Sequence, residues 1–231
     1  MTKAVDVQTE IVTFSTGAAQ LEGYLARPEG EGPFPAVVVI HEMLGLNDNI
    51  RDIARRFAHE GYMALAVDLF AGRNRTICMM RFMSQMLLQP LNNGSLDGLR
   101  SALTYLENIR EVDPARLGAI GFCLGGGFAI AWACRDDRLK AIAPFYGANP
   151  HPLSAVSRLC PVVGSYPGKD FTASQAQKLD ATLDQYNVPH DIKIYPETKH
   201  SFFNDQGSSY DAEASADSWQ RVLSFFKEHI A

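Results

Sequence analysis

The chain has 231 residues, of which 46% are hydrophobic and 20% are charged, and its formal net charge is −5. This size and balance suit one globular domain, 1–231, with a core large enough to fold alone. The acidic charge and the lack of a lysine and arginine run argue against nucleic acid as a partner. The first residues carry scattered charges, and no stretch of about 18 apolar residues occurs. We therefore expect no signal peptide, no membrane partner and a cytoplasmic location.

The N-terminal part of the chain alternates between strand-like and helical patterns. Segments 5–14 and 21–27 alternate apolar and polar residues and predict an antiparallel hairpin. The run 35–40 is apolar and rich in β-branched residues, which is typical of a strand buried on both faces of a parallel sheet. Helical spacing of apolar residues follows over 49–60, and Gly61 ends that helix.

The rest of the chain continues this alternation. Strands are predicted over 62–69, 116–122, 140–146, 160–166 and 191–195, and helices over 76–88, 96–109, 124–134, 174–186 and 212–229. Strands that alternate with helices predict an α/β fold, in which a mostly parallel sheet carries helices on both faces. In such sheets the functional residues lie at the carboxyl ends of the strands.

The chain contains four cysteines, which are Cys78, Cys123, Cys134 and Cys160. None of them forms a CxxC pair, so neither a zinc site nor a thioredoxin-like motif is expected. We expect free thiols, and we interpret three of them as structural, because small buried cysteines are common. The exception is Cys123.

Cys123 lies in the sequence Gly-Phe-Cys-Leu-Gly-Gly-Gly, which follows a predicted strand and begins a predicted helix. This is the pattern of a nucleophile elbow, with cysteine at the position of the nucleophile. The helix N-terminus is expected to favour a thiolate or an oxyanion at that point. The alternative interpretation is a glycine-rich turn around a structural cysteine.

A nucleophilic cysteine needs an imidazole to take its proton and a carboxylate to orient that imidazole. Asp170 and His200 each follow a predicted strand, in the chain order that this kind of fold uses. Asp68 comes too early in the chain to be the usual acid, and Asp205 fits the start of a turn. The other histidines considered fit surface or capping positions better, and they are His59, His151, His190 and His229.

The chain resembles the dienelactone hydrolase family over nearly its whole length. The residues that carry the resemblance are the Cys123 elbow, His41-Glu42-Met43-Leu44-Gly45-Leu46-Asn47, Gly168-Lys169-Asp170 and His200-Ser201-Phe202. The resemblance implies an α/β-hydrolase fold that cleaves a small-molecule ester or lactone through a thioester acyl-enzyme, with Cys123 as nucleophile, His200 as base and acid, and Asp170 as orienting acid. It implies neither a metal nor an organic cofactor.

The resemblance also assigns supporting roles around the nucleophile. Glu42 is expected to control when the thiolate forms, since a nearby carboxylate opposes that ionisation. The backbone N–H groups of Met43 and Leu124 are expected to form the oxyanion hole. His41 and Tyr146 are candidates for substrate binding, although a packing or orienting role is favoured for His41.

One departure from the family's namesake concerns the substrate. That enzyme grips a substrate carboxylate with two arginines; Asn204 stands at one of these positions here, and Arg81 is a candidate match for the other. Loss of one charge-assisted contact weakens such an anchor by roughly 1.5–3 kcal/mol, so dienelactone is not expected to be the natural substrate.

Segment 73–88 is rich in methionine and contains three arginines. It predicts either an adaptable apolar cover over the cleft, with arginines at its rim, or a helix packed on the core through Ile77, Met80 and Met83 or Leu87. We favour core packing, because apolar stripes at helical spacing are usually buried.

Two other functions stay open at this point. An acyltransferase would pass the acyl group to an acceptor other than water, and an idle hydrolase fold would bind a ligand without turnover. The complete set of cysteine, aspartate and histidine argues against an idle site. We expect a monomer or a small homo-oligomer.

Overall fold

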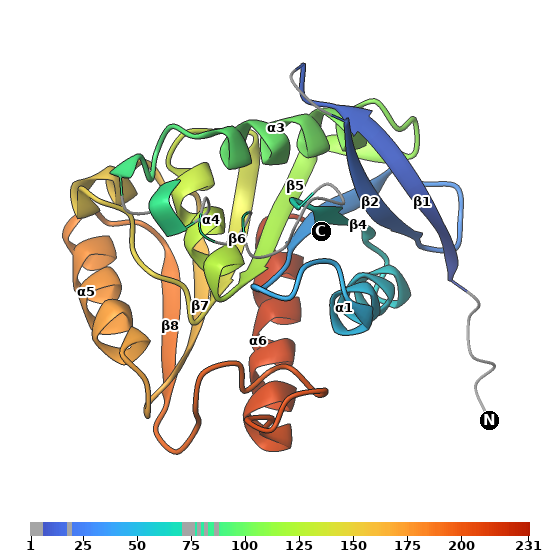
Figure 1. Cartoon of the computed structure of the whole chain (residues 1–231). Coiled ribbons are helices and arrows are strands. Elements are labelled where there is room, and N and C mark those ends of the chain that lie inside the picture. Colours follow the sequence, from blue (N-terminus) through green and yellow to red (C-terminus); the bar gives the residue numbers. More distant parts are fainter. Residues whose placement is uncertain (1–6, 18–19, 71–76, 78–79, 81–82, 86–87) are drawn as a thin grey trace.

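The computed structural model describes residues 7–17, 20–70, 77, 80, 83–85 and 88–231. Its centre is an eight-stranded sheet in the order β1-β2-β4-β3-β5-β6-β7-β8 (Figure 1). The strands are β1 (Gln8–Ser15), β2 (Gln20–Arg27), β3 (Phe34–Ile40), β4 (Met63–Asp68), β5 (Val112–Phe122), β6 (Leu139–Phe145), β7 (Val162–Pro167) and β8 (His190–Tyr195). Every one of these strands except β1 and β5 begins within two residues of its predicted first residue.

The pairing confirms the predicted α/β architecture. β1 and β2 form the expected antiparallel hairpin, and β2 pairs antiparallel with β4. Every other pair in the sheet is parallel. Parallel neighbours end at the same edge of the sheet, so the residues that follow β3, β5, β6, β7 and β8 meet there.

Helices cover both faces of the sheet (Figure 1). α1 (Asp48–His59) and α6 (Ala212–His229) pack on one face, and α3 (Gly94–Glu107), α4 (Leu124–Ala133) and α5 (Thr172–Gln185) pack on the other. In β3, Val38 points into the α3–α4–α5 side, and Val37 and Val39 point into the α1–α6 side. All three are fully buried, which explains why this strand is apolar without alternation.

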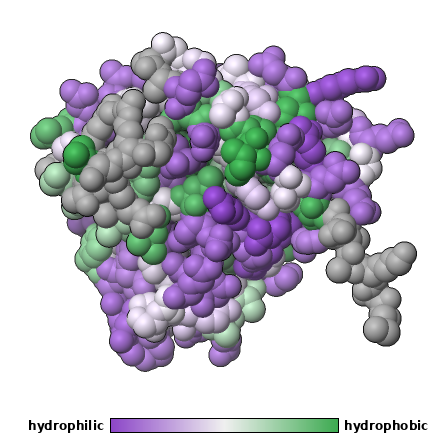
Figure 2. All heavy atoms as spheres, turned by 45° about the vertical axis from the view of Figure 1, so that its right-hand side comes forward, coloured by the Kyte–Doolittle hydropathy of each residue, from purple (hydrophilic) through white to green (hydrophobic). Residues whose placement is uncertain are grey.

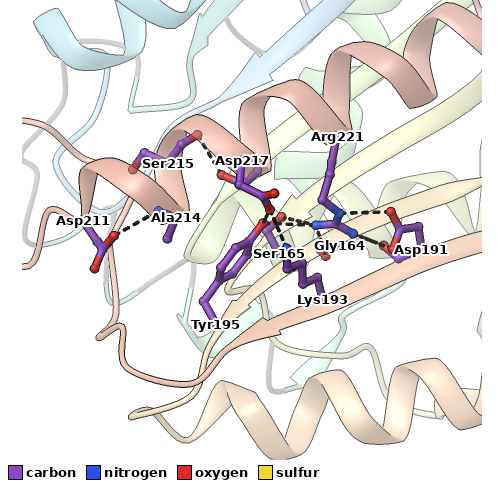
Figure 3. Close-up of polar contacts among 11 residues, drawn as sticks. Gly164, Ser165, Asp191, Lys193, Tyr195, Asp211, Ala214, Ser215, Asp217 and Arg221 are labelled. Carbon is purple, nitrogen blue, oxygen red and sulfur yellow. Dashed lines mark hydrogen bonds and ion pairs between the residues drawn. The ribbon is translucent and has the colours of Figure 1, made fainter.

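α6 is fixed to the sheet by a polar network as well as by apolar packing. Figure 3 shows Arg221 of α6 reaching across β7 and β8. Its guanidinium lies 2.7 Å from the Asp191 carboxylate and donates to Ser165 Oγ at 3.2 Å. Next to it, Tyr195 donates its hydroxyl hydrogen to Asp217 at 2.7 Å. The Arg221 side chain is 14% exposed and the Asp191 side chain is 52% exposed, so the guanidinium is covered by protein while the carboxylate faces water, and together these contacts join α6 to β7 and β8.

Two features differ from the sequence predictions. A 3₁₀ helix, η1 (Leu153–Arg158), lies between β6 and β7 and was not predicted. The described residues of segment 73–88 are helical, but Ile77, Met80 and Met83 are 63%, 61% and 56% exposed. The predicted packing of these three side chains on the core is therefore wrong. Leu87 lies outside the described residues. Among the helices that the structure describes, none has the length and apolar character to cross a membrane.

Candidate active site

The predicted catalytic residues lie at one edge of the sheet, directly after neighbouring strands. Register pairs near this edge align the strand ends, and they are Ile40 with Gly121, Phe122 with Phe145, Phe145 with Ser165, and Pro167 with Tyr195. Glu42 follows β3, Cys123 follows β5, Tyr146 follows β6, Asp170 follows β7 and His200 follows β8. Segments up to 158 residues apart in the chain are thus neighbours in space, as the strand-end argument predicted.

Cys123 occupies a strained turn between β5 and α4. Its backbone has φ 56° and ψ −116°, a conformation that a residue with a side chain rarely adopts and that costs of order 1–3 kcal/mol. The turn is held by the Cys123 N–H, which donates to Phe145 O at 3.1 Å, and by the Cys123 carbonyl, which accepts from Gly126 and Gly127. Strain maintained in this way at a strand end is typical of a nucleophile elbow.

The glycines of the elbow are required by close backbone contacts. A Cβ at Gly121 would lie 2.1 Å from Gly125 O, and a Cβ at Gly125 would lie 2.4 Å from Ile40 O. No side chain fits at either position without moving backbone. The motif therefore lets β3, β5 and α4 approach closely enough to align Glu42 with Cys123.

The Cys123 thiol is strongly held in its protonated form. Burial raises its pKa to about 12, and the charges of Glu42 and Asp170 act in the same direction. The backbone N–H of Leu124 donates to the sulfur and lowers the pKa, but this effect is smaller than those of burial and Glu42. The Leu124 donor at the helix N-terminus thus acts in the expected direction, but burial and the charges of two carboxylates outweigh it, so the resting group is a thiol.

His200 and Asp170 are joined by a hydrogen bond between the imidazole Nδ1 and the carboxylate Oδ2. The Asp170 side chain is only 7% exposed, whereas the His200 side chain is 33% exposed. Thr172 fixes the carboxylate further, since its hydroxyl donates to Oδ2 at 3.1 Å. With Nδ1 committed to Asp170, the Nε2 atom is the ring nitrogen left to exchange a proton. The sequence analysis did not identify Thr172, although a threonine two residues after an aspartate is a common local hydrogen-bond pattern.

Tyr146 contacts both Glu42 and His200. It is 1% exposed, and its hydroxyl donates to Glu42 Oε1 at 2.9 Å. Its ring lies 5.0 Å from the His200 ring, and its pKa is raised well above the ordinary value by burial, by Glu42 and by Cys123. It therefore stays a neutral donor. In this position Tyr146 holds Glu42, and its candidate role in substrate binding stays a prediction.

Glu42 has a second neutral partner that the sequence analysis did not assign. Asn204 Nδ2 donates to Glu42 Oε2 at 3.4 Å, and both residues are buried. The Asn204 amide is oriented by the Gln206 N–H, which donates to its Oδ1 at 3.0 Å. This second bond leaves Nδ2 as the atom that faces Glu42. No local pattern predicts a contact between two residues 162 positions apart.

His41 is committed on both ring nitrogens. Nδ1 lies 2.6 Å from Glu42 O, which can only accept, and Nε2 lies 3.2 Å from the Leu69 N–H, which can only donate. The imidazole is therefore neutral with its proton on Nδ1. The ring is 3% exposed and packs 4.7 Å from Phe70. This geometry agrees with the favoured orienting role, because His41 ties the Glu42 loop to the end of β4, and its candidate role in substrate binding stays a prediction.

The remaining predictions for the site divide into those the structure describes and those it does not. The backbones of Met43 and Leu124 follow β3 and Cys123, as an oxyanion hole requires, and their roles stay predictions. Arg81 and Cys78 lie outside the described residues. Cys134 is buried, and Cys123, Cys134 and Cys160 are free thiols. Within the described ranges, no group of three or more His, Cys, Asp or Glu residues is arranged to hold a metal ion.

A mostly parallel eight-stranded sheet with helices on both faces, a strained elbow after one strand and a histidine–aspartate pair after two others defines an α/β-hydrolase. Solved structures agree with this class. Acylaminoacyl peptidase from Pyrococcus horikoshii superimposes with a TM-score of 0.80 at 16% identity, over 99% of this chain and 42% of that chain. A dienelactone hydrolase-like promiscuous phosphotriesterase from metagenomic libraries superimposes with a TM-score of 0.87 at 26% identity, over 97% of this chain and 99% of that one.

Sequence comparison places the chain more narrowly. The profile of the dienelactone hydrolase family matches residues 21–230, and the chain belongs to this family. A Synechocystis sp. protein named "Putative carboxymethylenebutenolidase" is 32% identical over 98% of this chain and 99% of its own length. A protein of the same name from Saccharolobus solfataricus is 34% identical over 94% and 97%. The family and the fold predicted from the sequence are confirmed, and hydrolase chemistry is supported at the level of the family.

Proposed function

We propose that this protein is a cysteine-dependent hydrolase that cleaves an ester or lactone through a thioester acyl-enzyme. The observation that carries the proposal is that the strained elbow of Cys123 and the hydrogen-bonded pair of His200 and Asp170 lie at the same sheet edge. A nucleophile, a proton acceptor and a group that orients the acceptor are the three parts that acyl transfer to an enzyme needs.

In the first half of the proposed reaction, His200 Nε2 takes the thiol proton while Cys123 Sγ attacks the carbonyl carbon. The carbonyl oxygen becomes an oxyanion, which the backbone N–H groups of Met43 and Leu124 stabilise. When the intermediate collapses, the C–O bond to the leaving alkoxide breaks, and His200 returns the proton to that oxygen. The alcohol leaves and the acyl group stays on sulfur as a thioester.

In the second half, water attacks the thioester carbon while His200 takes one of its protons. The C–S bond then breaks, the acid product leaves, and the proton returns to the Cys123 sulfur. Throughout both steps Asp170 keeps the proton of the neutral imidazole on Nδ1 and stabilises the imidazolium that forms. Because the resting thiol has a pKa of about 12, attack depends on proton removal at the moment when the substrate is bound.

The test combines two cysteine variants that differ in position but not in residue type. Cys123→Ala is expected to lower turnover of a small activated ester by at least about a thousandfold, whereas Cys134→Ala should retain it. Cys134 is a matched control because it is a buried free thiol, also with a pKa raised to about 12, at the other end of α4. Mass spectrometry of wild-type enzyme with a slow ester should show one acyl group on Cys123.

Two results would contradict the proposal. One is wild-type turnover by Cys123→Ala, which would remove the nucleophile from the mechanism. The other is the lack of any acyl-enzyme and of any turnover across a broad ester panel, which would favour an idle binding fold.

A further inference from the structure

Among the described residues, the charges that act on the Cys123 thiol are negative. Glu42 and Asp170 both act on the sulfur, and each raises its pKa. In the described part of the chain, Glu42 forms no ion pair and accepts hydrogen bonds from two neutral groups, Tyr146 and Asn204. The partners of Asp170 are Thr172 and His200. A bound anion close to the sulfur would therefore meet two carboxylates, of which one has only neutral partners.

Asn204 has a central part in this arrangement. Its side chain is buried and its amide orientation is fixed by the Gln206 N–H, so it offers Glu42 a hydrogen bond without a positive charge. A cationic side chain at this position would instead neutralise Glu42 and offer an anchor to a substrate carboxylate. Among the described residues, this neutral amide and the Tyr146 hydroxyl donate to the Glu42 side chain, and neither brings a positive charge.

Apolar side chains are exposed on the same catalytic loops. Met43 and Leu44 follow Glu42 and are 40% and 48% exposed, and Phe171 follows Asp170 and is 69% exposed. The Phe171 ring stacks on the His200 ring, with centroids 6.1 Å apart and planes 13° from parallel. Exposed apolar side chains on loops that carry functional residues commonly mark surface that a ligand covers. Figure 2 shows that one face of the molecule carries apolar patches set among hydrophilic surface.

From these observations, and on the basis of the proposed function, we infer that the site takes uncharged esters with an apolar acyl group and discriminates against anionic ones. Asn204 is the specificity-determining residue, because it gives Glu42 a neutral hydrogen-bond donor at a position where a cationic side chain would bind anionic substrates. Met43, Leu44 and Phe171 provide the apolar contact. The negative charge near the Cys123 sulfur and the exposed apolar side chains on the loops both favour an uncharged, apolar ester.

A pair of matched esters tests the inference on the wild-type enzyme. p-Nitrophenyl hexanoate and the p-nitrophenyl monoester of adipic acid differ only in that a terminal methyl group is replaced by a carboxylate. With the rates without enzyme subtracted, kcat/KM for the neutral ester should be at least tenfold higher, which corresponds to about 1.4 kcal/mol. The anionic ester alone should react faster as salt is added, because salt screens repulsion. Equal kcat/KM values, or faster reaction of the anionic ester, would overturn the inference.

Two substitutions test the residues that carry it. Asn204→Lys should raise the ratio of anionic to neutral kcat/KM at least tenfold and weaken its salt dependence. If that variant does not fold, Leu44→Lys supplies the charge on an exposed loop and should move the ratio in the same direction. Ile11→Lys is the matched control. Ile11 is 56% exposed on β1, the outermost strand on the hairpin side of the sheet, and the substitution should leave the ratio unchanged. A ratio that stays constant in a folded Asn204→Lys or Leu44→Lys would contradict the inference.

The two proposals fail in different ways. If Cys123→Ala turned over the neutral ester like the wild type, the proposed function would be wrong. If the anionic ester were cleaved through Cys123 as fast as the neutral one, the proposed function would stand and the substrate class would be wrong.

Discussion

The Glu42→Gln substitution removes a buried negative charge that acts on the Cys123 thiol and keeps the side chain's shape. The Cys123 thiol should become more acidic, because one of the groups that oppose its ionisation is lost. The substituted side chain can still accept the Tyr146 hydroxyl hydrogen through its carbonyl, whereas its amide opposes the Asn204 amide, so one of the two hydrogen bonds is lost. Because the hydrogen bond from Tyr146 and the size of the side chain are kept, the variant is expected to fold.

The magnitude follows from Coulomb's law. At an effective dielectric constant of about 20, a unit charge contributes about 2–3 kcal/mol, or roughly 1.5–2.5 pKa units, at separations of about 5–8 Å, and of the charges that act on this thiol Glu42 has the largest effect. Burial is the larger cause of the raised pKa and persists in the variant. The thiol pKa should accordingly fall from about 12 by at least about one unit and stay above its ordinary value of 9.0.

The assay is the rate of alkylation by iodoacetamide as a function of pH, followed at the Cys123 peptide by mass spectrometry. Reading that peptide separates Cys123 from the other thiols, and Cys123→Ala gives the background. Asp68→Asn is the matched control, since Asp68 is the last residue of β4 but is not among the charges that raise the Cys123 pKa. An unchanged pH profile in Glu42→Gln, or an equal shift in Asp68→Asn, would refute this account of the resting thiol.

Three further predictions concern the rest of the site and the fold. Asp170→Asn should lower kcat by about 10²- to 10⁴-fold with little change in KM, because the imidazole loses its orienting carboxylate; steady-state kinetics with a neutral ester measures both. Arg221→Ala should lower the free energy of unfolding by about 1–2 kcal/mol in denaturant titrations while the folded enzyme keeps its kcat, since hydrogen bonds to the half-exposed Asp191 and to the buried Ser165 are lost; an unchanged unfolding midpoint would count against the network. Burial raises the pKa of Cys134 from 9.0 to about 12, so between these pH values the unfolded chain releases the thiol proton while the folded chain keeps it, and the free energy of unfolding falls as pH rises. Cys134→Ala should reduce this dependence of stability on pH in thermal melts from pH 8 to about 11. An identical pH dependence in the variant would exclude the Cys134 thiol as its cause.

Much of the fold could be predicted because its signals are local. The apolar run of β3 and the helical spacing of α1 depend on burial of whole elements, and both elements were found within one or two residues of their predicted bounds. The elbow was equally local, since glycines at close backbone contacts and a cysteine at a strand end lie within seven residues. Patterns of this kind survive in a single sequence because each requires particular residue types at fixed spacing.

The parts that were missed depend on distant partners. Helical spacing of Ile77, Met80 and Met83 was interpreted as core packing, but spacing does not state which side of a helix faces the protein, and these side chains are exposed. The roles of Tyr146 and Asn204 rest on hydrogen bonds to Glu42 across 104 and 162 positions. Neither contact leaves a local pattern, so only the sheet register brings them into view.

The thiol of Cys123 shows why residue types alone do not determine a site's resting state. A cysteine at a helix start favours ionisation when the helix dipole and a backbone donor act alone, and the Leu124 N–H does lower its pKa. Here the register of β3 against β5 places Glu42 beside the sulfur, and burial removes the water that would stabilise a thiolate. Burial and Glu42 therefore outweigh the helix start and the backbone donor, and the thiol stays protonated. Under the proposed mechanism, activation would come with the substrate, and an uncharged ester can expel water from the site without adding a third negative charge to it.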